Sequence, residues 1–161
     1  MQLEDPSYFY AIQADDNGLI MNMFWADARS IIDYTYFGDV VCFDTTYRTN
    51  EYGRPFAPFL GVNHHRQTII FGATLLYDET ADSFKWLFET FLSAMSGKQP
   101  KSILTDQCAA MAKAIKEVFF ETQHRLCVWH IYQNAAKHLS HVFHSSKEFE
   151  SCIAFIKRIC P

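Results

Sequence analysis

The chain has 161 residues, of which 49% are hydrophobic, and its 18 acidic and 14 basic residues give a net charge of −4. This composition suits one domain with a sizeable core and excludes both a disordered chain and a globally basic nucleic-acid binder. Residues 1–60 carry nine acidic and three basic side chains, whereas residues 124–161 carry two and five. An anionic partner would therefore meet the C-terminal part more readily.

The sequence shows no signal peptide, no membrane span and no disulfide framework. It begins with Met1-Gln-Leu-Glu-Asp-Pro, which lacks a basic start and an apolar stretch. The five cysteines are odd in number, widely spaced and without a Cys-x₂-Cys pair. We therefore expect a soluble intracellular protein with free thiols and no membrane contact.

The first half of the chain reads mainly as strands. Residues 18–25 suit a short strand, and a short helix follows with Asp27 near its start. Residues 39–47 are β-branched and aromatic, with a continuous apolar run typical of a buried strand. Residues 56–63 and 68–77 are two further strands around a polar turn at residues 64–67. These three consecutive strands predict an antiparallel meander.

The second half alternates helices with short strands. An apolar stripe from Phe84 to Met95 predicts a helix, with Thr80 as its N-cap and Gly97 as its stop. A strand at residues 102–105, a helix around residues 111–119, a brief segment at residues 125–127 and two further helices from Val128 onward complete the pattern. The order β-β-β-α-β-α-β-α predicts an α/β protein with a mixed sheet, as in the ribonuclease H-like fold.

Two aspartates follow predicted strands directly. Asp44 ends the run Val40–Phe43, and Asp106 follows Ile103-Leu104-Thr105. Ligands usually bind at this edge of an open α/β sheet, and two adjacent carboxylates need a cation or a shared proton. Mg²⁺ accepts carboxylate oxygens and suits phosphodiester chemistry. The alternatives stay open at this point, because Asp106 could instead cap a helix and Asp44 could close its strand with an Asx turn.

Cys127 and His130 form a Cys-x₂-His pair at the start of a predicted helix. Both side chains could reach one Zn²⁺, but a structural zinc site needs four ligands and no convincing second pair is present. The alternative is a hydrogen-bonded histidine beside a buried cysteine.

Five motifs occur in order along the chain and together resemble a known family. They are Phe43-Asp-Thr-Thr-Tyr47, Pro58-Phe-Leu-Gly-Val-Asn-His-His65, Ser83-Phe-Lys-Trp-Leu87, Ile103-Leu-Thr-Asp-Gln107 and Cys127-Val-Trp-His-Ile131. The chain is similar to the transposase domain of Mutator-like elements (MULE), most of all to the plant far-red impaired response and far-red elongated hypocotyl family.

The resemblance implies a ribonuclease H-like core with an Asp, Asp, Glu triad. Asp44 matches the first acid and Asp106 the second, as an ancestral magnesium pair. Cys127 and His130 match the Cys-x₂-His motif of the family. The third acid of the family lies well after this motif, and Glu148 and Glu150 are placed too early for it. We therefore expect an incomplete C-terminus, and a fragment or truncated product without the zinc-binding DNA-recognition and SWIM modules of the plant regulators.

These expectations divide the chain into a lead-in segment (residues 1–17), a transposase-like core (18–145) and the start of a helical insertion (146–161). They indicate a domesticated transposase acting in nuclear transcription regulation, with DNA or chromatin and protein partners, as a homo- or hetero-dimer. Catalysis by this chain is not expected. Two alternatives remain, an Asp-Asp-Glu transposase cut short of its third acid and an interaction domain with no nucleic-acid role.

Overall fold

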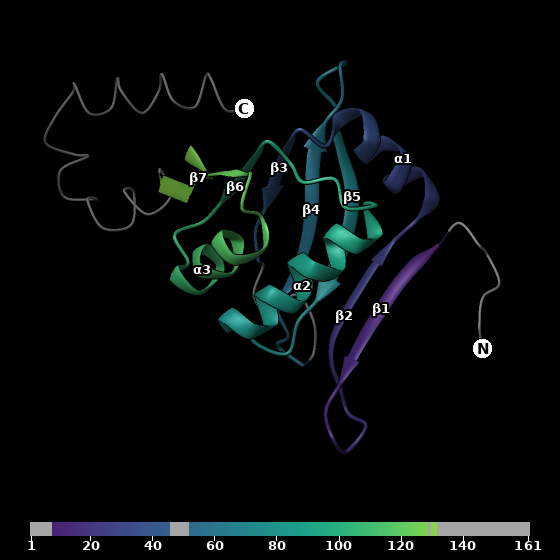
Figure 1. The fold of residues 1–161 in the computed structure, drawn as a ribbon, viewed down its shortest axis with the longest axis vertical. Coiled ribbons are helices and arrows are strands. Elements are labelled where there is room, and N and C mark those ends of the chain that lie inside the picture. Colours follow the sequence, from purple (N-terminus) through teal and green to yellow (C-terminus); the bar gives the residue numbers. More distant parts are fainter. Residues whose placement is uncertain (1–7, 46–51, 129, 132–161) are drawn as a thin grey trace, which may run out of the picture.

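The computed structural model describes residues 8–45, 52–128 and 130–131. Within these residues one seven-stranded sheet runs in the order β1-β2-β5-β4-β3-β6-β7 (Figure 1). The strands are β1 (Phe9–Ala14), β2 (Ile20–Ala26), β3 (Val40–Phe43), β4 (Phe56–Val62), β5 (Thr68–Leu75), β6 (Ser102–Thr105) and β7 (Gln123–Leu126). The helices are α1 (Ala28–Phe37), α2 (Ala81–Ala94) and α3 (Ala109–Val118).

The first two strands form an antiparallel hairpin at one edge of the sheet. Its turn is held by Asp15, whose Oδ1 accepts from the backbone N–H groups of Asn17 at 2.9 Å and Leu19 at 2.8 Å. Gly18 supplies the positive φ of 79° that this turn requires. The strand predicted at residues 18–25 is therefore present, whereas β1, which lies in the predicted lead-in segment, was not predicted.

The antiparallel meander predicted from the three apolar runs is confirmed, with β4 pairing β3 on one side and β5 on the other. The predicted turn between β4 and β5 is also present. Asn63 Oδ1 accepts from the backbone N–H groups of His65 and Gln67, and Arg66 adopts a φ of 63°. Helix α2 lies across one face of the sheet (Figure 1). Nonpolar side chains from these strands and from α2 pack together in one buried cluster.

Helix α2 begins and ends as its sequence predicts. Thr80 is the N-cap, with its hydroxyl accepting from the backbone N–H of Ser83. At the other end the N–H of Gly97 donates to Leu92 O at 2.8 Å, and Gly97 has a φ of 79°. This is the arrangement of a Schellman-type stop. The apolar stripe of α2 is buried, with Phe84, Phe88 and Phe91 fully inaccessible to solvent.

The C-terminal half adds two parallel strands. Strand β6 pairs with β3 in parallel, and β7 pairs with β6 in parallel. Helix α3 lies between them in the chain and packs against α2. The sheet is therefore mixed, and the predicted α/β class with a mixed sheet is confirmed, as is the predicted order of strands and helices from β3 to β7.

The helices predicted after Val128 lie outside the described residues, apart from Val128, His130 and Ile131, which are helical. Within the described ranges no helix has the length and apolar character that a bilayer crossing requires.

Candidate carboxylate site

The two sequence-predicted aspartates lie beside each other at one edge of the sheet. The parallel register pairs Val41 with Ile103 and Cys42 with Leu104. Asp44 and Asp106 each come two residues after the last of these partners, so they leave neighbouring strands at the same edge. The structure thus brings together the two carboxylates that the sequence singled out, and their chemical role stays a prediction.

The third member of the site is His130. Its Nε2 lies 2.8 Å from Asp44 Oδ2, and the two side chains are 24% and 39% exposed. His130 reaches this position because β7 ends at the same edge and a helical turn follows it. The N–H of Cys127 donates to Thr105 O at 2.7 Å, and the N–H of Ile131 donates to Cys127 O at 3.1 Å. The turn is therefore fastened to the end of β6.

Asp106 lies in an environment that disfavours its charge. Burial raises its pKa most, the negative charges of Asp44 and Glu79 raise it further, and His130 and the backbone N–H of Cys108 act in the opposite direction. Its Oδ1 atom is buried and has no hydrogen-bond partner among the described residues. A raised pKa together with a buried oxygen that lacks a partner among the described residues makes Asp106 a candidate functional residue.

Glu79 is a site residue that the sequence analysis missed. It lies between β5 and α2, and its Oε1 accepts a hydrogen bond from the hydroxyl of Thr45, the residue after Asp44. Its charge also acts on Asp106. The signal that could have found it is strand direction. In an antiparallel meander β5 runs the same way as β3, so the segment after β5 returns to the edge that holds Asp44.

The helix-cap alternative for Asp106 is wrong. Helix α3 begins at Ala109, and its N-cap is Cys108, which makes no side-chain cap hydrogen bond. The carboxyl of Asp106 accepts from the backbone N–H of Cys108, but Asp106 lies outside the helix. The loop therefore presents this side chain to the sheet edge.

The donor atoms at this edge are carboxylate oxygens and one imidazole nitrogen. Carboxylate oxygens of Asp44 and Asp106 suit magnesium, and the unpartnered Oδ1 of Asp106 suits an oxygen-bound cation. Within residues 8–45, 52–128 and 130–131, however, no group of three or more His, Cys, Asp or Glu side chains is placed to hold one metal ion. Cys127 is a free, half-buried thiol. Magnesium at Asp44 and Asp106 and zinc at Cys127 and His130 both stay predictions.

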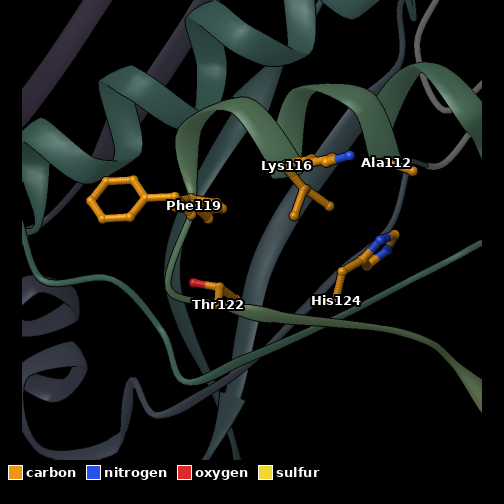
Figure 2. A pocket seen from close by; sticks show the side chains of 7 residues that line it. Ala112, Lys116, Phe119, Thr122 and His124 are labelled. Atoms are coloured by element: carbon orange, nitrogen blue, oxygen red, sulfur yellow. The ribbon is translucent and has the colours of Figure 1, made fainter.

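A separate hollow of about 360 Å³ lies between α3 and β7. Lys116 on α3 and His124 on β7 line opposite walls of it (Figure 2). His124 turns its Nε2 to the hydroxyl of Thr105 at 2.8 Å, and burial lowers its pKa. None of the carboxylates of the site lines this hollow, so the two features are distinct.

Solved structures with a similar chain path include two retroviral integrase cores. The catalytic core domain of HTLV-2 integrase in complex with magnesium has a TM-score of 0.36 and 17% identity, covering 73% of this chain and 81% of that chain. The catalytic core domain of BIV integrase has a TM-score of 0.36 and 10% identity, covering 73% of this chain and 80% of that chain.

Sequence comparisons are more specific. Residues 40–134 match the model of the MULE transposase domain. Protein FAR1-RELATED SEQUENCE 5 of Arabidopsis thaliana is 50% identical over 94% of this chain, and Protein FAR-RED IMPAIRED RESPONSE 1 of the same plant is 42% identical over 91%. The chain spans about a fifth of the length of these relatives, 19% and 18% respectively. The chain therefore belongs to the MULE transposase domain family, within the group of FAR1-related proteins.

Proposed function

We propose that this chain is the transposase-derived part of a nuclear transcription regulator of the far-red impaired response type. It acts on DNA or chromatin together with modules outside this chain, and with protein partners as a homo- or hetero-dimer. The observation that carries the proposal is the 50% identity to Protein FAR1-RELATED SEQUENCE 5 over 94% of the chain. The matched region of 151 residues takes in 94% of the chain.

Two contacts of the site tie together segments that lie far apart in the sequence. Asp44 is engaged by His130, and Glu79 is engaged by Thr45. Each contact links two segments that leave the sheet at the same edge. We infer that Asp44 and Glu79 now help to hold this edge together through these two contacts, while recognition of DNA comes from outside the chain.

A reporter assay tests this function. The full-length protein that contains this chain, fused to a promoter-tethering domain in plant cells, should change reporter transcription and should accumulate in the nucleus. A variant with Asp44→Asn and Asp106→Asn should keep the response, since no catalysis is required. Phe59→Ala, which removes a core side chain, should abolish it. An unchanged reporter with the unaltered protein would rule the proposal out.

A second function, DNA cleavage and strand transfer, is favoured by one specific observation. Asp44 and Asp106 do converge, and a third carboxylate, Glu79, acts electrostatically on Asp106. If the chain is a nuclease, the purified protein should nick supercoiled DNA with Mg²⁺, and Asp44→Asn should remove that activity. Asp16→Asn, in the exposed turn after β1, is the matched control.

A further inference from the structure

We propose that His130 is a positioning residue that holds the carboxylate of Asp44, and that the Cys-x₂-His motif exists to place it there rather than to bind zinc. The proposal concerns the architecture of the site, so it holds or fails independently of the transcriptional function proposed above.

The contact itself has the geometry of a charge-assisted hydrogen bond. The 2.8 Å separation between His130 Nε2 and Asp44 Oδ2 falls in the range of such bonds. His130 is the more shielded partner at 24% exposure, which restricts the orientations that its ring can adopt. A ring held in this way fixes one of the two oxygens of Asp44, and therefore fixes the direction of the carboxylate relative to Asp106.

The spacing of the motif follows from the helical turn. Cys127 contributes its backbone to the end of β6, through the hydrogen bond from its N–H to Thr105 O. Residues three apart in a helix lie on the same face, one turn along. His130 therefore lies on the same face of the turn as Cys127, and from there its ring reaches Asp44. This explanation uses the backbone of Cys127, and it requires nothing of the thiol.

The contact also offsets repulsion between neighbouring carboxylates. Asp44 and Glu79 both act on Asp106 as like charges, whereas His130 acts on it in the opposite sense. Neighbouring carboxylates repel one another unless a hydrogen-bond donor or cation lies between them. His130 supplies a donor at this position from within the chain. A zinc site would need four ligands, and the described residues contain no group of three placed for a metal.

A double-mutant cycle on the 161-residue chain tests the coupling. His130→Ala, Asp44→Ala and the double variant are compared by urea unfolding. We expect the two effects to be non-additive by about threefold or more in the unfolding equilibrium constant, as for side chains in direct contact. Cys127→Ala combined with Asp44→Ala is the matched control and should be additive. Additive effects at His130 would overturn the proposal.

Zinc content is measured on the same preparations. The chain should purify with no stoichiometric zinc, and EDTA should leave its unfolding curve unchanged. One equivalent of zinc that is lost in both Cys127→Ala and His130→Ala would show that the motif is a metal site, and would overturn the proposal.

A spectroscopic measurement separates positioning from bulk stability, and it does not depend on destabilised variants. In the unaltered chain, NMR should show a His130 Nε2–H protected from solvent exchange. Its resonance should move in Asp44→Asn but not in Asp82→Asn, an exposed acid in the first turn of α2. His130→Gln, which keeps a donor, should restore part of the coupling, and His130→Phe should not. A His130 signal that is insensitive to Asp44 would refute the assignment.

Discussion

Phe43 and Asp44 are consecutive residues, yet they lie in two opposite kinds of environment. Phe43 is 1% exposed and its ring packs against those of Phe59 and Phe88. Asp44 is 39% exposed and contacts His130. The same step is repeated on the neighbouring strand, where Thr105 is fully buried and Asp106 follows it at the sheet edge.

The fold places the residues that stabilise it and the candidate site residues in different regions. The aromatic core, defined here by Phe24, Phe43, Phe59, Phe84, Phe88 and Phe91, gains free energy from nonpolar burial and ring packing. The carboxylate edge, defined here by Asp44, Glu79, Asp106 and His130, gathers like charges and leaves a buried oxygen without a partner among the described residues. Substitutions in the two regions should therefore differ in size and even in sign.

The largest effect is expected in the aromatic core. Phe59 is fully buried and stacks on Phe91 with ring centroids 4.0 Å apart. Phe59→Ala should lower the free energy of unfolding by about 3–5 kcal/mol, because it removes the burial of a ring and leaves a cavity. Urea unfolding followed by circular dichroism measures this loss. The control Phe120→Ala, at a 75% exposed side chain, should change stability little, and equal losses would contradict the assignment of the core.

Much of the core was predictable because its signals are local. The stripe from Phe84 to Met95, the Thr80 cap and the run Val40–Phe43 each lie within a few residues of one another, so periodicity and capping rules identify them. Strand β1 was missed, although the pair Asn17-Gly18 is a strong hairpin signal. On its outward face Tyr10 and Ile12 are exposed but nonpolar, so the usual alternation of polar and nonpolar residues is weak.

The carboxylate edge was predictable only in part. Asp44 and Asp106 were found because each follows an apolar strand, which is again a local signal. Glu79 and the contact between His130 and Asp44 depend on strand direction and on the pairing of β3, β6 and β7 across long stretches of chain. Side chains 86 positions apart, as His130 and Asp44 are, meet only through tertiary structure. No periodicity in the sequence encodes such a meeting.

At the carboxylate edge, removing a charge should stabilise the protein, whereas removing a core side chain destabilises it. Asp106→Asn should raise stability at pH 7, by up to about 1 kcal/mol after allowance for solvent screening. Folding raises the pKa of Asp106, first through burial. The folded state therefore favours the protonated carboxyl, so the stabilisation from Asp106 is complete below its unfolded pKa and is lost as pH rises through its folded pKa. The advantage of asparagine should therefore vanish at low pH. Urea midpoints for both proteins between pH 3 and pH 7 measure it, with Asp16→Asn as a neutral control; a loss of stability at pH 7 would contradict the prediction.

The smallest effect concerns His124, which lies beside the edge but contacts the core residue Thr105. The hydroxyl of Thr105 donates to Asp106 O at 2.9 Å, so it accepts from His124 Nε2. Burial lowers the pKa of His124, so the folded state disfavours its protonation. The stabilisation from neutral His124 is therefore complete above its unfolded pKa, near 6.5, and is lost as pH falls from that value through its folded pKa.

This loss should be about 0.5 kcal/mol or less, because His124 is partly exposed and solvent screens the charge. Thermal unfolding of the unaltered chain and of His124→Gln between pH 5 and pH 7.5 measures it. The glutamine keeps an N–H donor for Thr105 but does not titrate, so its curve should be flatter in this window. His65→Gln, in the exposed turn between β4 and β5, controls for removing a histidine. Parallel curves for the unaltered chain and His124→Gln would show that folding does not change the pKa of His124. They would also show that the position of this side chain on β7 is too exposed to disfavour its charge.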